Sequence, residues 1–199
     1  MKAILVKAQI LILACLTIVA SLQYKELDVE AASQPMEISY SSFNREAKKE
    51  LECLAENIYF EARSEPMEGM FAVAFVTMNR VLSPDYPNTI CEVVKQKIRT
   101  TCQFSWYCES GPYHISKNDL LTREYNAVYN EILRLSIYFY VNFENMRDPT
   151  YGALFYHADY VNPRWKNVRK TTQIGRHIFY EDKGKGNEQY IQYTLNQNI

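Results

Sequence analysis

The sequence has almost no excess charge and few of the residues that build metal sites. Its 199 residues include 22 lysines and arginines and 23 aspartates and glutamates, a net charge of −1. Because the positive and negative charges nearly cancel, the protein has no global electrostatic attraction to nucleic acid, and we exclude that class of partner. Only three histidines are present, and neither the CxxC nor the HxxxH spacing of common zinc sites occurs. We therefore expect no metal and no cofactor.

Long apolar runs are absent after residue 22, so no later segment could span a membrane. The start of the chain differs, because Lys2 and Lys7 flank and enter an apolar run over residues 4–22. A short basic start followed by such a run is typical of a secretory signal. The run is also nearly long enough for an uncleaved anchor. We expect an exported protein, with residues 1–32 a signal peptide or membrane tether and 33–44 a polar linker.

Export determines how the five cysteines are interpreted. Cys15 lies in the leader, and the other four would meet an oxidising compartment in which disulfides persist. Four cysteines allow three pairings, and the sequence does not choose among them. We expect Cys102 to pair with Cys108 across a short loop, together with a second bond between Cys53 and Cys91.

Apolar spacing predicts a helix-dominated α+β domain over residues 45–181. The first helical pattern stops before Pro66, and the second is apolar on nearly every side, so we expect it to be the buried helix. No internal repeat is present, and residues 182–199 form a polar tail. The expected elements are helices over 45–62, 67–82, 89–97 and 120–140, an irregular stretch over 99–119, and short strands near 153–157 and 170–180.

Glu61 lies on the flank of the apolar face of the first helix. On a helical wheel of about 100° per residue, Glu61 falls beside the apolar stripe, whereas Glu52 and Glu56 fall toward solvent. Contact with apolar groups raises the pKa of a carboxyl group, and the C-terminal end of a helix acts in the same direction. Glu61 is therefore a candidate general acid. The alternative is a surface glutamate paired with Arg63 or Arg80.

Two further groups are candidates for substrate binding. The first is an amide, a hydroxyl and an indole in the irregular aromatic stretch, which suit a sugar ring but would also fit a structural loop held by a disulfide. The second group combines aromatic rings with a histidine. That histidine could polarise a substrate oxygen, or it could be a structural residue held by hydrogen bonds. The candidates are Gln103, Ser105, Trp106, Tyr156, His157 and Trp165.

Four sequence blocks resemble one enzyme family. The segment AENIYFEARSEPMEGMFAVAFVTMNRV over residues 55–81 is similar to the opening motif of the SleB/CwlJ-like cell wall hydrolases, which include the spore cortex-lytic enzymes. TICEVV at 89–94, CQFSWYC at 102–108, and GALFYHADYVNPRW with TTQIGRHIFY within 152–180 follow in the expected order. The resemblance implies a fold like that of lysozymes and lytic transglycosylases. It also implies cleavage between N-acetylmuramic acid and N-acetylglucosamine, with Glu61 as the catalytic glutamate.

The choice of mechanism depends on whether a second carboxylate is present. Lysozyme-type hydrolysis commonly needs two carboxylates, and none of Glu65, Glu68, Asp85 and Asp159 is an obvious partner. A lytic transglycosylase needs one acid/base, so we favour that reaction and keep muramidase hydrolysis as the alternative.

Two other classes of function also remain open. A cysteine–histidine amidase would need a free thiol at Cys53 or Cys102 near His157, and a non-catalytic module would only bind peptidoglycan. We expect a monomer that acts on peptidoglycan, and the basic cluster around Trp165 suits the peptide carboxylates of that polymer.

Overall fold

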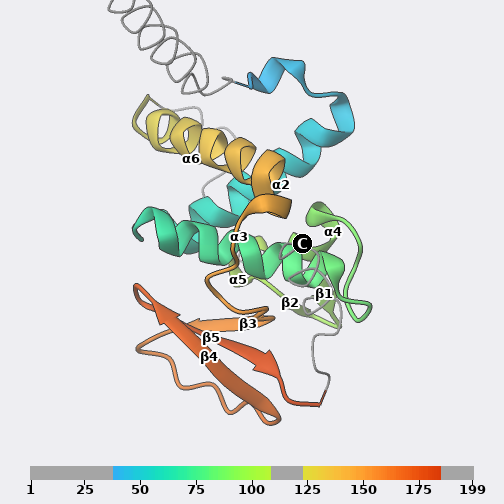
Figure 1. Ribbon diagram of the computed structural model, residues 1–199, viewed down its shortest axis with the longest axis vertical. Coiled ribbons are helices and arrows are strands. Elements are labelled where there is room, and N and C mark those ends of the chain that lie inside the picture. Colours follow the sequence, from blue (N-terminus) through green and yellow to red (C-terminus); the bar gives the residue numbers. More distant parts are fainter. Residues whose placement is uncertain (1–37, 109–122, 185–199) are drawn as a thin grey trace, which may run out of the picture. The chain divides into compact units, whose positions relative to one another are not determined.

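The structure, a computed structural model, describes residues 38–108 and 123–184, without the side chains of residues 123–126. The expected leader, residues 33–37 of the expected linker and the tail beyond residue 184 lie outside the described residues. The elements belong to one compact unit that begins at Ser39. They are η1 (Tyr40–Ser42), α2 (Arg45–Ala62), α3 (Met67–Leu82), α4 (Ile90–Val94), β1 (Lys97–Ile98), β2 (Thr101–Cys102), α5 (Ser105–Cys108), α6 (Arg123–Asn142), η3 (Phe143–Asn145), β3 (Phe155–Ala158), β4 (Val168–Ile174) and β5 (His177–Asp182) (Figure 1).

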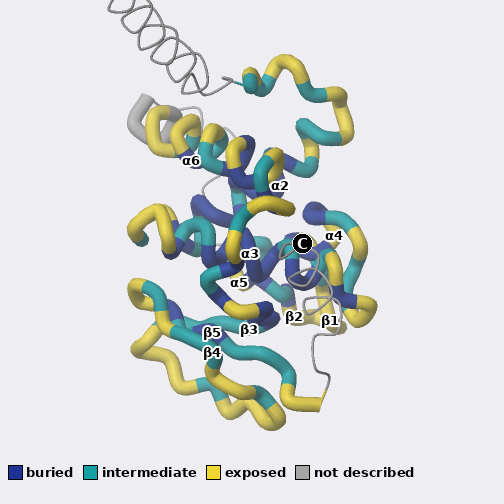
Figure 2. Tube along the Cα trace, in the orientation of Figure 1, coloured by how far each residue is buried: buried dark blue, intermediate teal, exposed yellow. Residues whose placement is uncertain are grey.

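The helices confirm the helix-dominated α+β prediction. Helix α2 begins after Asn44, whose side chain accepts a hydrogen bond from Ala47 N–H at 2.9 Å and so caps the helix. Thr89 caps α4 in the same way. Helix α3 is the buried one, since most of its residues from Ala72 to Arg80 are shielded from solvent (Figure 2). No helix among the described residues is long and apolar enough to cross a membrane.

Two glutamates of α2 are less exposed than the helical wheel predicts. Glu52 accepts a hydrogen bond from the Tyr40 hydroxyl at 2.6 Å, because the end of the expected linker forms η1 and packs on α2. Burial, followed by the nearby Glu52, raises the pKa of Tyr40 to about 12. Glu56 is also half-buried and lies close enough to Tyr129 of α6 to raise the pKa of that phenol, to which burial contributes most. The prediction that both carboxylates face solvent is therefore wrong.

Both expected disulfides are present. Cys53–Cys91 joins α2 to α4 with a Cα–Cα distance of 5.2 Å, and Cys102–Cys108 closes the loop that contains α5 at 5.7 Å. The first bond lies within the main core, where Ile58, Phe75 and Phe139 are almost fully buried between α2, α3 and α6. The catalytic candidate on α2 therefore stands on a helix that is covalently tied to its neighbour.

A three-stranded antiparallel sheet covers α3 on the side of Ala72 and Val76. Its order is β3-β5-β4, and Phe179 of β5 is buried against those two alanine and valine side chains. The expected strand over 170–180 is in fact a hairpin of β4 and β5 that turns at Gly175. Gly175 has φ +55°, a backbone conformation that residues with a Cβ rarely adopt, so the turn favours glycine.

The stretch over 99–119 is more ordered than expected in its first part. Strands β1 and β2 form a small antiparallel hairpin, and α5 follows it. The rest of that stretch, from residue 109, lies outside the described residues.

Candidate active site around Glu61

Glu61 lies in the last turn of α2, where two other elements reach it. The Tyr156 hydroxyl, from β3, donates a hydrogen bond to Glu61 Oε2 at 3.0 Å. Arg80, from α3, is 3% exposed and interacts electrostatically with Glu61. Three segments that are distant in sequence thus place a carboxylate, a phenol and a guanidinium group together. The phenol and the cation both stabilise the charged carboxylate, an effect opposite in sign to that of partial burial.

Arg80 is held by one hydrogen bond and two aromatic rings, while its Nη1 is buried without a hydrogen-bond partner among the described residues. Its Nε donates to the Leu154 carbonyl oxygen at 2.8 Å, and the guanidinium lies 5.5 Å from the Tyr86 ring centroid and 5.2 Å from that of Phe104. Burial lowers the pKa of Arg80, whereas Tyr86, Tyr156 and Glu61 oppose that shift. Arg63, the other expected partner of Glu61, donates instead to the Tyr59 carbonyl oxygen at 3.2 Å.

Tyr156 is a proton donor that does not ionise near neutral pH. Burial raises its pKa well above the ordinary value, the adjacent Glu61 raises it further, and Arg80 acts against them. The ring packs edge-on against His177 with centroids 5.2 Å apart and lies 5.7 Å from Phe179. The imidazole of His177 is buried, which lowers its pKa. Sequence analysis singled out Tyr156 but not His177, which shares its face of the sheet.

Two adjacent polar residues on α3 fix the chain that leads into β3. Asn79 donates to Asp148 Oδ2 at 3.0 Å and to the Ala153 carbonyl oxygen at 3.1 Å, while Arg80 binds the next carbonyl, that of Leu154. Asp148 also accepts from the Gly152 N–H at 2.8 Å. Sequence analysis missed Asn79 and Asp148. The available signal was a pair of polar residues inside an otherwise apolar helix.

Trp106 is anchored to α2, the helix that carries Glu61. Its indole Nε1–H donates to Asn57 Oδ1 at 3.3 Å, and its ring stacks on Phe60 with centroids 4.5 Å apart. Asn57 is fully buried and donates in turn to Thr77 Oγ1. The indole is therefore held against α2 one turn before Glu61, and its expected role in substrate binding stays a prediction.

Gln103 and Ser105 lie on the same loop as Trp106, and their side chains enter none of the contacts described above. Gln103 donates through its backbone N–H to the Gln96 carbonyl oxygen at 2.9 Å, and Ser105 is exposed at the start of α5. Their expected role in substrate binding stays a prediction.

The strand β3 separates the remaining candidates, because successive side chains of a strand point to opposite faces. Tyr156 faces Glu61, whereas His157 faces the other side and stacks on Tyr180. His157 Nε2 lies 3.0 Å from the Tyr180 hydroxyl and Nδ1 lies 2.8 Å from the Ala158 carbonyl oxygen. Trp165 packs edge-on against His157. His157 therefore has the contacts of a structural histidine, and with Trp165 it lies on the face of the sheet away from Glu61.

The cysteines and acidic residues limit which reactions the site could catalyse. Cys53 and Cys102 are both in disulfides, so neither is the free thiol that a cysteine–histidine amidase would need. Glu65 accepts from the Arg176 N–H at 3.1 Å, and Asp159 pairs with the Arg176 side chain at 3.5 Å. Within residues 38–108 and 123–184, no group of three or more metal-ligating side chains is present.

Several known proteins resemble this chain. It is 30% identical over 138 residues to a spore cortex-lytic enzyme of Bacillus cereus, covering 68% of this chain and 46% of that one. It is 31% identical over 137 residues to the spore cortex-lytic enzyme of Bacillus subtilis, covering 68% of this chain and 38% of that one. The chain thus spans less than half the length of these relatives.

Two solved structures are also similar. The catalytic domain of the Bacillus cereus SleB protein is 24% identical with a TM-score of 0.45, covering 74% of this chain and 98% of that one. The catalytic domain of the germination-specific lytic transglycosylase SleB from Bacillus anthracis is 26% identical with a TM-score of 0.43, covering 69% and 96%.

The family model described as Cell Wall Hydrolase matches residues 64–180, a range that begins just after Glu61. Because that match covers more than half of the sequence, this chain belongs to the cell wall hydrolase family.

Proposed function

We propose that this chain is exported and cleaves the glycan strands of peptidoglycan between N-acetylmuramic acid and N-acetylglucosamine, as a lytic transglycosylase. Membership of the cell wall hydrolase family supports the class of substrate, and relatives named spore cortex-lytic enzymes support it further. The observation that carries the proposal is the cluster of Glu61, Tyr156 and Arg80 at the end of α2.

In the proposed reaction, Glu61 is both the acid and the base. Its protonated carboxyl group donates a proton to the glycosidic oxygen, and the bond from that oxygen to the anomeric carbon of the muramic residue breaks. The carboxylate that results is stabilised by the hydrogen bond from Tyr156 and by the buried charge of Arg80. The carboxylate then takes the proton of the muramic 6-hydroxyl, whose oxygen bonds to the anomeric carbon and closes a 1,6-anhydro ring. Glu61 is thereby returned to its protonated form.

The partners of two other carboxylates, those of Glu65 and Asp159, favour a single acid/base. A retaining hydrolase holds its two carboxyl groups about 5–5.5 Å apart and an inverting one about 6.5–9.5 Å apart. Glu65, which follows Glu61 most closely in sequence, binds the backbone of Arg176 in the β4–β5 turn. Asp159 pairs with the Arg176 side chain. Both groups therefore have structural partners in the turn, which supports the transglycosylase over the hydrolase.

Export is supported by two observations. The N-terminal residues have the pattern of a secretory signal or tether. The domain contains two disulfides, which form and persist outside the cytoplasm.

The test is digestion of purified sacculi followed by mass spectrometry of the soluble products. Wild-type protein should release fragments that end in 1,6-anhydro-muramic acid, and Glu61→Gln should release none while keeping its thermal stability. Glu46→Gln is the matched control, because it removes a negative charge from an exposed position on the same helix. If the wild-type products end in reducing muramic acid, the reaction is hydrolysis and not transglycosylation. Undiminished cleavage by Glu61→Gln would remove Glu61 from the mechanism.

A further inference from the structure

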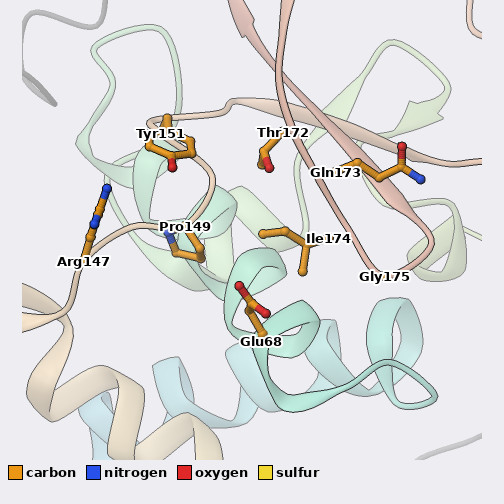
Figure 3. A pocket seen from close by; sticks show the side chains of 8 residues that line it. All are labelled: Glu68, Arg147, Pro149, Tyr151, Thr172, Gln173, Ile174 and Gly175. Carbon is orange, nitrogen blue, oxygen red and sulfur yellow. The ribbon is translucent and has the colours of Figure 1, made fainter.

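A groove with a volume of about 480 Å³ lies between the start of α3, the loop that follows η3, and the end of β4 (Figure 3). A volume of this size lies within the range of about 300–1,000 Å³ that ligand pockets span. Charged, aromatic and apolar groups all contribute to its walls. They include Glu68, Arg147, Pro149, Tyr151, Ile174 and Gly175.

The groove presents one acidic and one basic side chain from different elements. Glu68 projects from α3 toward Pro149 and Ile174, and Arg147 stands on the loop at the other end (Figure 3). Both are exposed, and neither makes a hydrogen bond or ion pair with another residue of the described part of the chain. The two charges are thus available to a ligand that carries both signs.

The loop wall of the groove is rigidly built. Tyr151 has φ +56°, a conformation that is sterically unfavourable for a residue with a Cβ. The conformation is maintained because Asp148 accepts hydrogen bonds from Thr150 N–H at 2.7 Å and from Gly152 N–H at 2.8 Å, on either side of Tyr151. Tyr151 is 51% exposed. A half-exposed aromatic ring on a fixed backbone can pack against apolar parts of a ligand.

The groove shares its walls with the elements that hold Glu61. Gly175 at its edge lies against Glu65, four residues after Glu61. The loop that carries Tyr151 continues into β3, which delivers Tyr156 to Glu61. A ligand that extends from one site to the other would therefore contact a continuous part of the domain.

We propose that this groove binds the peptide stem of peptidoglycan, with a stem carboxylate on Arg147 and the ammonium group of a diamino acid on Glu68. The proposal rests on the proposed function, since the stem is attached to the muramic residue next to the bond to be cleaved. Uncharged N-acetylated sugars in the groove would cover both charged side chains without giving either a partner of opposite charge, which disfavours the binding of sugars there. A peptide stem supplies both charges, and its methyl and methylene groups would pack on Tyr151.

A binding measurement tests the groove without requiring cleavage. The probe is an N-terminally acetylated tetrapeptide stem with diaminopimelate at its third position, titrated calorimetrically into Glu61→Gln protein. Arg147→Gln and Glu68→Gln should each weaken its binding by about tenfold or more, as loss of a hydrogen bond between charged groups does. Acetylating the diaminopimelate amine should weaken binding to the same extent and leave the Glu68→Gln variant unaffected. Equal affinity of the stem for the parent protein and both variants would overturn the proposal.

A kinetic measurement tests whether the groove serves the reaction. On glycan strands that carry stems, Arg147→Gln and Glu68→Gln should raise KM by about tenfold with little change in kcat. On strands stripped of their stems, both variants should match the wild type. The matched controls, Arg134→Gln and Glu131→Gln, remove the same charges from exposed positions on α6. An equal rise in KM on both kinds of strand would overturn the proposal. A wild-type protein that cleaves neither strand would refute the proposed function alone, because the calorimetric result decides the stem site.

Discussion

Replacing Tyr156 by phenylalanine removes one hydroxyl group and tests whether that hydroxyl acts on Glu61. The ring can keep its packing against His177 and Phe179, so the change is confined to the 3.0 Å hydrogen bond. A hydrogen bond to a charged group is worth about 1.5–3 kcal/mol. If that stabilisation is present when the carboxylate forms in the transition state, kcat should fall by about ten- to a hundredfold.

The pH dependence of the same variant should change in a defined direction. The Tyr156 hydroxyl favours the carboxylate form of Glu61 over the protonated form. Without it, the protonated acid persists to higher pH, so the alkaline limb of the activity profile should move upward. Initial rates on solubilised glycan strands across the pH range would measure both effects.

Thermal unfolding separates this effect from damage to the fold. Loss of this one hydrogen bond should lower the free energy of unfolding by at most about 3 kcal/mol, which leaves the protein folded at assay temperature. Tyr138→Phe is the control, because Tyr138 is 57% exposed on α6. If Tyr156→Phe retains the wild-type kcat and pH profile, the phenol does not assist Glu61 and the proposed cluster loses its second member.

Four further predictions concern the domain and its export. Removing the Cys53–Cys91 bond, which closes a separation of 38 residues, should lower the free energy of unfolding by about 4 kcal/mol, measured by urea denaturation of the double serine variant. Arg80→Met should leave the buried Leu154 carbonyl oxygen without its donor and cost about 1–3 kcal/mol, measured in the same way; an unchanged urea midpoint would contradict the contact. The lowered pKa of buried His177 means that the unfolded state binds its proton more readily, so its contribution to stability is complete above about pH 6.5 and is lost as the pH falls through the folded-state value; His177→Phe should flatten that part of the curve of stability against pH. Expression of the full chain should place the protein outside the cytoplasm, and N-terminal sequencing should show whether residues 1–32 have been removed; a cytoplasmic protein with intact Met1 would contradict export.

Local patterns predicted α2 and α3 well because their causes are local, whereas the helix expected over 89–97 ends at Val94 and Lys97 begins β1. The bounds of α2 and α3 follow from the apolar spacing, from the cap at Asn44 and from the break before Pro66. The hairpin of β4 and β5 was missed because the apolar residues Ile174, Ile178 and Phe179 lie on both sides of Gly175, and the positive φ of that glycine cannot be read from the sequence. A periodic pattern predicts which face of a helix or strand is apolar, but not which other segments of the chain pack against it.

The same limit applies to the site. The helical wheel placed Glu61 beside the apolar stripe, yet it treated Glu52 as solvent-exposed because it contains no information on Tyr40 folding back over α2. Tyr156 was a candidate because of its aromatic ring, whereas the convergence of Tyr156 and Arg80 on one carboxylate depends on tertiary packing. The separation of His157 from Glu61 required the register of β3.

The two contacts that α3 makes with the chain before β3 have a consequence for sequence divergence. Asn79 and Arg80 bind the carbonyl oxygens of Ala153 and Leu154, and every residue type provides a carbonyl oxygen. Substitutions at 153 and 154 that fit the available space can therefore accumulate without displacing Tyr156. Inserting or deleting one residue between Leu154 and Tyr156 would instead turn the phenol to the opposite face of the sheet. Across homologues, this short segment should vary only among residues that fit its buried surroundings, while its length stays constant.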